Sequence, residues 1–318
     1  MKFLITGACG FIGSNLTEML LKNGHEVVGV DAFTQNYPVQ IKEANRKALK
    51  EFGKFELLSV DLLEAPLHDL LEDIDVIFHL AGHPSVSNSW GDEFQTYVDR
   101  NIVLTQRLLR AAVEVETPKF VNSSSSSIYG KVAKTPTIEG DEKKPVSPYG
   151  VTKLAAENLC TLFGKEYGLP TVSLRYFTVY GPRQRPDMAF NKIIKSGLEK
   201  SEFHLYGDGS QVRDFTFVSD VAQANLLAAT SEVEPGSVFN IGGGSPVTMT
   251  YAIEKIQEIL GVEILIEQES FGLGNPMITE ADCSAARESL NWQPKVRIDE
   301  GLASQVEWQR SSYESPSF

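Results

Sequence analysis

Short apolar runs alternate along the first half of the chain with longer stretches in which apolar residues recur every three or four positions. A short continuous run predicts a strand buried on both faces, and the longer periodic stretches predict amphipathic helices. The expected strands span residues 3–5, 26–30, 55–60, 76–80, 120–124 and 171–175, and the expected helices residues 14–22, 96–115 and 149–167. This alternation predicts an α/β fold with a doubly wound parallel sheet.

The regular pattern loosens after Arg175. Residues 181–186 and 206–210 are rich in glycine, proline and polar side chains, and they predict loops. We expect the C-terminal third to form a smaller lobe over the carboxyl edge of the sheet, where folds of this kind bind their ligands. The expected division places residues 1–174 and 213–242 in the larger domain and residues 175–212 and 243–318 in the smaller lobe.

Three glycines, Gly7, Gly10 and Gly13, follow the first expected strand. Glycine at such a turn lets the backbone approach a diphosphate closely, and the amides that open the next helix, at Phe11 and Ile12, offer donors and a positive dipole. The loop therefore predicts a nucleotide site of the Rossmann type. Taken alone, three glycines fit an ordinary turn equally well.

Asp31 ends the second expected strand, 18 residues after Gly13. A carboxylate at this place can bind the ribose hydroxyls of adenosine, and it would repel a 2'-phosphate, so NAD is favoured over NADP. The alternative for Asp31 is a plain turn residue at the end of a strand. The glycine spacing, Gly-x-x-Gly-x-x-Gly, differs from the common dinucleotide fingerprint Gly-x-Gly-x-x-Gly.

Composition narrows the class of protein. The chain has 318 residues, of which 42% are hydrophobic and 22% are charged, as in an ordinary globular protein. A net charge of -13 disfavours binding to nucleic acid or to an anionic membrane. The apolar run at the start is too short for a signal peptide, and three widely spaced cysteines suit a reducing compartment. We therefore expect a cytoplasmic protein with no disulfide framework and no metal site.

A tyrosine and a lysine, Tyr149 and Lys153, lie four residues apart behind Ser147 and Pro148, which predict a helix start. On a helix the two side chains share one face. A neighbouring ammonium and a cationic nicotinamide would both lower the phenol pKa from its usual value of about 10. Tyr149 could then remove a hydroxyl proton while a hydride leaves the same carbon. Such a pair by itself is usually only a solvated helix face.

Several segments of the chain resemble the extended branch of the short-chain dehydrogenase/reductase superfamily, which contains the sugar-nucleotide epimerases and dehydratases. The resemblance covers nearly the whole chain and includes its glycine spacing. The matching segments are TGACGFIG at 6–13, HLAG at 79–82, SSSSSIYG at 123–130, SPYGVTK at 147–153, RYFTVYGPRQRP at 175–186, DGSQVRDFTFVSDV at 208–221, NIGGG at 240–244 and TEAD at 279–282.

The resemblance implies tightly held NAD in the larger domain and a nucleotide sugar in the smaller lobe. It implies a catalytic set of Ser125, Tyr149 and Lys153, in which the serine shares the proton with the tyrosine. The alternative for residues 123–127 is a strand end that runs into a polar loop. The residues that would bind the cofactor are Gly7, Gly10, Phe11, Ile12, Gly13, Asp31, Asp61, Leu62, Leu80, Ala81, Gly82, Tyr149, Lys153 and Tyr176.

The two positions after Ser125 indicate the reaction. The 4,6-dehydratases of this family carry Asp and Glu there, whereas this chain has Ser126 and Ser127. Neither serine can act as a carboxylic acid, which disfavours dehydration. UDP-glucuronate decarboxylases usually carry Glu where Ser127 stands. The resemblance therefore implies epimerisation at C4 of a UDP-sugar through a 4-keto intermediate.

The serine pair, Thr178 and the run at 181–190 look most like bacterial UDP-glucuronate 4-epimerases. Three hydroxyl groups could hold the C6 carboxylate without protonating it. Those relatives usually carry Arg near the position of Ser87, and this chain lacks it. UDP-glucose or UDP-N-acetylglucosamine therefore remains an alternative substrate. Two further alternatives are a UDP-glucuronate decarboxylase and a noncatalytic NAD-binding protein, although the intact catalytic set argues against the second.

Four more residues are candidates for contact with the UDP-sugar. Arg185 and Arg213 carry guanidinium groups that match phosphate oxygens, although loop arginines are often plain surface residues. Leu205 and Tyr206 stand where relatives hold uracil, or form part of a core strand. His83 follows the cofactor segment but has no evident partner in the sequence.

The expected helices at 96–115 and 149–167 carry a row of apolar residues, and relatives pair these two helices across a two-fold axis. A homodimer is therefore expected. Asn101, in the first of these helices, is expected only to cap or to pack. The apolar residues proposed for the dimer contact are Leu104, Leu108, Leu109, Leu159 and Phe163.

Overall fold

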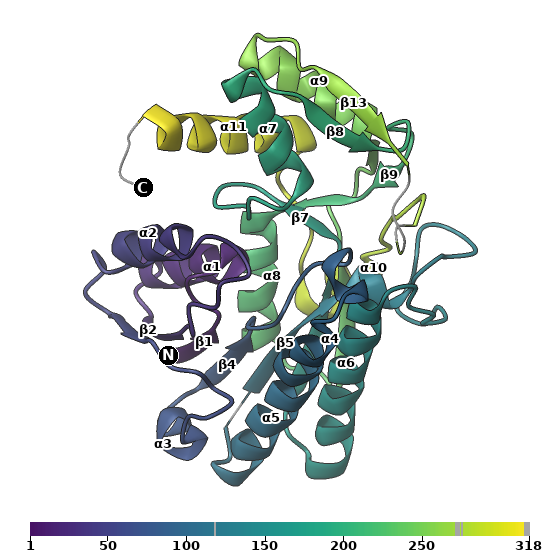
Figure 1. Ribbon diagram of the computed structural model, residues 1–318. Coiled ribbons are helices and arrows are strands. Elements are labelled where there is room, and N and C mark those ends of the chain that lie inside the picture. The colour runs from purple at the N-terminus through teal and green to yellow at the C-terminus, as the bar shows by residue number, and fades with distance from the viewer. Residues whose placement is uncertain (118, 271–273, 275, 315–318) are drawn as a thin grey trace.

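The structure is a computed structural model, and it describes residues 1–117, 119–270, 274 and 276–314. Its larger part is built on a seven-stranded sheet with the strand order β11-β6-β5-β4-β1-β2-β3 (Figure 1). All neighbouring strands pair in parallel, so the expected doubly wound sheet is confirmed. The strands are β1 (Lys2–Thr6), β2 (Glu26–Val30), β3 (Phe55–Leu58), β4 (Val76–His79), β5 (Lys119–Ser125), β6 (Thr171–Tyr176) and β11 (Ser237–Ile241).

Helices cover both faces of this sheet, and each face has its own core. One core packs α1 and α8 against the sheet, and the other packs α3, α5 and α6. The strands carry long apolar runs because both of their faces are buried. The helices are α1 (Phe11–Lys22), α2 (Val39–Leu49), α3 (Leu67–Leu71), α4 (Phe94–Tyr97), α5 (Leu104–Glu114), α6 (Pro148–Tyr167) and α8 (Val218–Thr230).

The expected helix at 96–115 is a composite of three segments. A π-helical segment, η2 (Val98–Val103), joins α4 to α5. Wide turns of this kind are often found at functional sites because they redirect the side chains within a helix. Leu104, Leu108 and Leu109 are at most 2% exposed and belong to the core under the sheet. The proposal that these three leucines form a dimer contact is therefore wrong.

A smaller lobe follows the sheet and has a separate core. It contains α7 (Ala189–Glu199), β8 (Phe203–Tyr206), α9 (Met249–Leu260), β13 (Ile266–Glu269) and α11 (Ile298–Glu314). Figure 1 shows this lobe at the top of the view, above α1 and α2. The connecting segments are β7 (Thr178–Tyr180), β9 (Val212–Arg213), β10 (Phe215–Phe217), β12 (Val247–Thr248) and α10 (Ser284–Leu290).

The strand order reverses at β1, which pairs with β2 on one side and with β4 on the other. A parallel sheet opens a crevice at such a switch point, at the carboxyl ends of its strands. The fold therefore places a ligand site between the glycine loop and the end of β4. Within the described ranges, no helix is both long enough and apolar enough to cross a membrane.

Candidate active site

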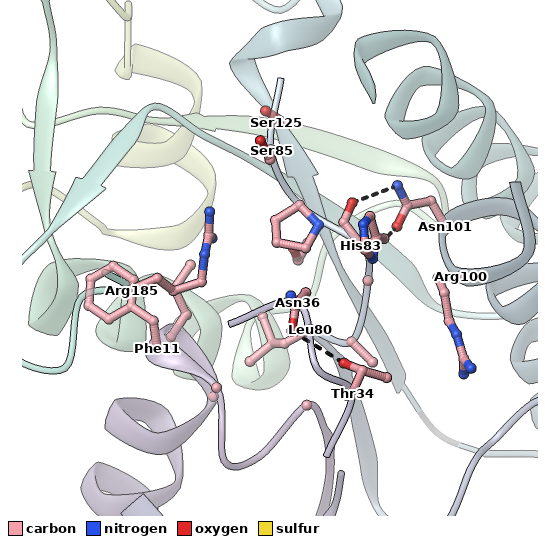
Figure 2. Close-up of a pocket in the computed structure, with 18 of the residues that line it drawn as sticks. Phe11, Thr34, Asn36, Leu80, His83, Ser85, Arg100, Asn101, Ser125 and Arg185 are labelled. Atoms are coloured by element: carbon pink, nitrogen blue, oxygen red, sulfur yellow. Dashed lines mark hydrogen bonds between the residues drawn. The ribbon is translucent and has the colours of Figure 1, made fainter. Parts of the chain in front are cut away.

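A cavity of about 690 Å³ opens at this switch point, a volume in the range of small-molecule sites. The glycine loop, the ends of β2, β4 and β5, the start of α6 and the segment from Thr178 to Met188 line it. Figure 2 shows Phe11 and Arg185 on one side of this cavity and Arg100 and Asn101 on the other. All fourteen residues expected to bind the cofactor line it.

The glycine loop brings α1 very close to β1. Gly7 has a φ of +71°, which favours glycine, and its amide donates to the Val30 carbonyl at 2.7 Å. A Cβ atom on Gly13 would lie 2.1 Å from the Gly7 carbonyl oxygen, so no larger residue fits there. Gly10, at the N-cap of α1, supplies no side-chain acceptor for the first amides. This cradle fits a diphosphate such as that of NAD.

Asp31 lies at the end of β2 and is only 5% exposed. Its carboxylate accepts hydrogen bonds from the backbone amides of Cys9, at 3.1 Å, and Phe33, at 2.8 Å. The Lys42 ammonium of α2 lies 3.3 Å from the same carboxylate. Lys42 also lines the cavity. The acid is therefore held in place as a ribose ligand would need to be, but its charge is partly balanced.

Asp61 is a second paired acid in the cofactor end of the cavity. Arg100, from η2, donates to its two oxygens at 2.5 and 2.7 Å. This fork lowers the pKa of the Asp61 carboxyl and raises that of Arg100. Asp61, Leu62 and Arg100 all line the cavity, at the place where adenine is expected.

The start of α6 places the catalytic candidates. Ser147 caps the helix by accepting from the Gly150 amide at 3.1 Å, and Pro148 fills the first turn, as the sequence indicated. Tyr149 and Lys153 then both face the cavity. Burial raises the pKa of the Tyr149 phenol, while a hydrogen bond with Ser125 and the charge of Arg185 act in the opposite direction.

The expectation that Lys153 would lower the Tyr149 pKa is wrong for the protein alone. Lys153 donates instead to the Ser123 carbonyl at the end of β5. Burial lowers the pKa of Lys153 to about 8, and the nearby Cys160 and Glu157 act against this shift. The Lys153 ammonium therefore loses its proton at a lower pH than an ordinary lysine does.

A buried ion pair between β6 and α6 lies next to this end of β5. Arg175 donates to both oxygens of Glu157 at 2.9 and 2.7 Å, and both side chains are nearly fully buried. Ser124 donates to the same carboxylate at 2.6 Å. Removing one member of such a pair leaves an unpaired buried charge, so the network fixes β5 against α6.

The residues expected to hold the sugar lie beside this catalytic set. Ser126 and Ser127 belong to a 3-10 turn, η3 (Ser126–Ile128), directly after β5, and the Ser127 amide donates to the Ser125 hydroxyl at 3.1 Å. Both serines line the cavity, together with Thr178 at the start of β7. Three residues that carry hydroxyl groups therefore line the same cavity as Tyr149.

Of the four remaining candidates for contact with the UDP-sugar, one lines the cavity and three do not. Arg185 lines the cavity and pairs with Asp187 through two hydrogen bonds of 2.9 and 2.8 Å. Arg213 lies outside the cavity, where it donates to the Val212 and Met277 carbonyls. Leu205 is buried in the core of the lobe, and Tyr206 is 51% exposed. Contact of these last three with uracil or phosphate stays a prediction.

The segment after β4 is held by Asn101, which sequence reasoning left out of the site. Its carbonyl accepts from the His83 amide at 2.7 Å and its amide donates to the His83 carbonyl at 3.1 Å (Figure 2). A Cβ atom on Gly82 would lie 2.9 Å from the same Asn101 oxygen. The His83 ring packs on Tyr97, whose hydroxyl donates to Pro84. His83 lines the cavity with a pKa lowered by burial.

This arrangement on a seven-stranded parallel sheet is that of the extended short-chain dehydrogenases/reductases. The sequence profile of the NAD dependent epimerase/dehydratase family matches residues 3–242. The chain belongs to this family, and it is an NAD-dependent enzyme of the epimerase class.

Curated relatives span the whole chain. A Bacillus subtilis protein named as an uncharacterized UDP-glucose epimerase is 41% identical, over 99% of both chains. A UDP-glucuronate 4-epimerase of Thermodesulfobacterium geofontis is 36% identical, over 98% of this chain and 97% of its own. The crystal structure of UDP-glucuronic acid 4-epimerase from Bacillus cereus, in complex with UDP-glucuronic acid and NAD, has a TM-score of 0.95 at 41% identity. It matches 98% of this chain and all of the other.

Proposed function

We propose that the protein interconverts UDP-glucuronate and UDP-galacturonate by reversible oxidation at C4, through a 4-keto intermediate. The observation that carries this proposal is the placement of Ser126 and Ser127 in the cavity, directly beside Ser125 and Tyr149. Hydroxyl groups can hold a carboxylate but cannot supply the acid that dehydration needs. A relative and a solved structure that act on or bind UDP-glucuronate support the same substrate.

The catalytic residues act on the C4 hydroxyl. Bound NAD would supply the acceptor and then the donor for the C4 hydride. Tyr149 removes the hydroxyl proton and later returns it, with the Ser125 hydroxyl sharing that proton. Lys153 lies one helical turn further along α6, and with NAD bound its positive charge would stabilise the phenolate. Turning the 4-keto sugar within the cavity presents its other face, and this inverts C4.

The carboxylate group of the substrate sets a second requirement. A 4-keto uronic acid is a β-keto acid, which loses carbon dioxide when the scissile bond aligns with the carbonyl. Ser126, Ser127 and Thr178 offer neutral hydrogen bonds that hold the carboxylate away from this alignment. A glutamate at residue 127 would add a proton donor and a second negative charge.

A neutral UDP-hexose is the second candidate substrate, because UDP-glucuronate 4-epimerases usually carry an arginine near the position of Ser87, and this chain lacks it. Ser85 and Val86 of the same segment line the cavity. A Bacillus subtilis relative named as a UDP-glucose epimerase agrees with it. A decarboxylase and a noncatalytic NAD-binding protein are disfavoured by Ser127 and by the intact catalytic set. Incubation of the purified protein with UDP-glucuronate, UDP-glucose and UDP-N-acetylglucosamine, followed by separation of the products, tests the assignment. Turnover of a neutral sugar alone would refute the uronate substrate.

We also propose a cytoplasmic homodimer, in which residues 1–174 and 213–242 bind NAD and residues 175–212 and 243–318 bind the UDP-sugar. The dimer is supported by large apolar side chains that lie exposed on η2 and α6. Val151 is 49% exposed, Leu162 51% and Tyr167 65%, and Val103 lies on the adjoining segment at 40%. Large exposed apolar side chains on two packed helices are typical of a subunit interface.

A further inference from the structure

Three consecutive side chains of the loop at 181–186 bind three different parts of the molecule. Arg185 points into the active-site cavity, beside Phe11 of α1 in Figure 2. Gln184 is 3% exposed and binds the lobe, where its carbonyl accepts from the Asn191 amide at 2.9 Å and from Gln305 of α11 at 2.7 Å. Arg183 binds α1, at Ser14 and Glu18.

The contact of Arg183 with α1 is polar and nearly enclosed. Its guanidinium donates to the Ser14 carbonyl at 3.1 Å and to the Glu18 carboxylate, and the side chain is 14% exposed. Asn15 adds a bond from α1 to the Pro182 carbonyl at 3.1 Å. The loop is therefore tied to the same helix whose first turn forms the diphosphate cradle.

The backbone at Arg183 is strained. Its φ is +67°, a left-handed conformation that costs energy for any residue other than glycine. A strained residue of this kind persists only where the surrounding bonds hold it, and such residues gather at functional sites. Here the bonds to Ser14 and Glu18 hold it, and the turn sends the next two side chains to the lobe and into the cavity.

We propose that Arg183 is a positioning residue. Its bonds to α1 clasp the loop at 181–186 to that helix, and this places Arg185 where it can bind the UDP-sugar next to the NAD site. This inference rests on the proposed UDP-sugar substrate. It assigns to Glu18, outside the cavity, a role in substrate affinity. The Arg183–Glu18 pair is largely shielded from water, so it holds the loop more firmly than an exposed pair would.

The experiment measures the Kd of NAD-loaded protein for UDP-glucuronate by calorimetry. Arg183→Gly removes the side chain but suits the left-handed backbone, and it should weaken binding about tenfold with its NAD content unchanged. Glu18→Gln removes the charge that pairs with Arg183 and should also weaken the binding of UDP-glucuronate. Lys22→Ala is the matched control, because Lys22 pairs with Glu18 but is 61% exposed, and its Kd should equal that of the wild type.

A double-mutant cycle tests whether Arg183 acts through Arg185. If it does, the Arg183→Gly/Arg185→Ala protein should bind no more weakly than Arg185→Ala alone. The inference would be overturned if Arg183→Gly and Glu18→Gln both bound UDP-glucuronate with the wild-type Kd. It would also be overturned if the effects of the two substitutions multiplied fully in the double variant, or if Arg183→Gly lost its NAD. Tight binding of UDP-glucuronate without turnover would refute the proposed function and leave the clasp standing, whereas a wild type that binds no UDP-sugar would overturn both.

Discussion

Asp31 and Lys42 form an ion pair at the cofactor end of the cavity, with 3.3 Å between the ammonium and the nearer carboxylate oxygen, and both side chains are about 5% exposed. The pair gives this end of the cavity one negative and one positive group. Removal of the carboxylate charge would leave Lys42 as an unbalanced cation, which attracts a phosphate.

The pair predicts how the protein distinguishes the two nicotinamide cofactors. Asp31→Asn keeps an acceptor for only one of the Cys9 and Phe33 amides, which donate to different oxygens of Asp31. It removes the repulsion of a 2'-phosphate, so the preference for NAD over NADP should fall by about tenfold or more. Titration of the cofactor-free protein with each dinucleotide measures this ratio. Asp69→Ala is the control, because Asp69 lies on the exposed side of α3, and it should leave the ratio unchanged. An unchanged ratio in Asp31→Asn would remove Asp31 from cofactor selection.

A buried histidine predicts how stability depends on pH. Thr6 accepts from the Leu80 and Ala81 amides, so its one hydroxyl hydrogen goes to Nδ1 of His79 at 2.9 Å. Thr105 gives its hydrogen to the Asn101 carbonyl and accepts from Nε2 of His79 at 3.0 Å. A second ring proton has no acceptor, and burial lowers the pKa of His79 to about 3.

The unfolded chain binds a proton at His79 near its ordinary pKa of 6.5, whereas the folded chain does not until about pH 3. Stability therefore falls as the pH falls through this window, by about 2 kcal/mol between pH 7 and pH 5 from this one group. Urea unfolding of the wild type and of His79→Gln at both pH values measures the difference. Equal losses in the two proteins would show that His79 is protonated in the fold.

Substitutions of Ser127 test whether this one position distinguishes an epimerase from a decarboxylase. Ser127→Ala loses one hydrogen bond to the carboxylate and should lower the epimerisation rate by about tenfold. Ser127→Glu should lower it further, because a second carboxyl group repels the first, and it should release some UDP-pentose. Mass spectrometry after incubation with UDP-glucuronate measures both products. Epimerisation by Ser127→Glu at the wild-type rate would mean that this position does not face the C6 group.

The exposed apolar side chains of α6, Val151 and Leu162, predict the position of the dimer interface. Val151→Glu/Leu162→Glu places charges on the α6 surface and should yield monomers of 35.1 kDa in light scattering, whereas the wild type should have twice this mass. Leu265→Glu is the matched control, since Leu265 is 61% exposed on the lobe, and it should remain dimeric. A wild type of 35.1 kDa at working concentration would refute the dimer.

The sequence predicted the place in the fold of those residues whose signal is local, and their roles toward NAD and substrate stay predictions. The glycine loop, Asp31 and the Tyr149–Lys153 pair each depend on neighbours within one strand, turn or helix. The expected strands all occur, with ends that differ by up to two residues.

The missed residues act across long separations. The carboxylate partners of Lys42, Arg100 and Arg183 lie 11, 39 and 165 residues away in the sequence. No local sequence pattern indicates these ion pairs. Asn101 gave one usable signal, a polar residue within a helical apolar pattern, and the structure shows it fixing the segment after β4. The pattern around Leu108 predicts an apolar helix face but does not say whether that face packs on the sheet or on a second subunit, and the structure shows it buried under the sheet.

The central claim, that C4 is oxidised and reduced again within one active site, is tested most directly with UDP-glucuronate that carries deuterium at C4. Incubation with the purified protein and no added NAD, followed by NMR of the products, should show UDP-galacturonate that retains deuterium at C4, because the hydride returns to the carbon it left. Tyr149→Phe should give no product while keeping its NAD. A UDP-galacturonate with protium at C4, or no C4 epimer at all from the wild type, would contradict the account.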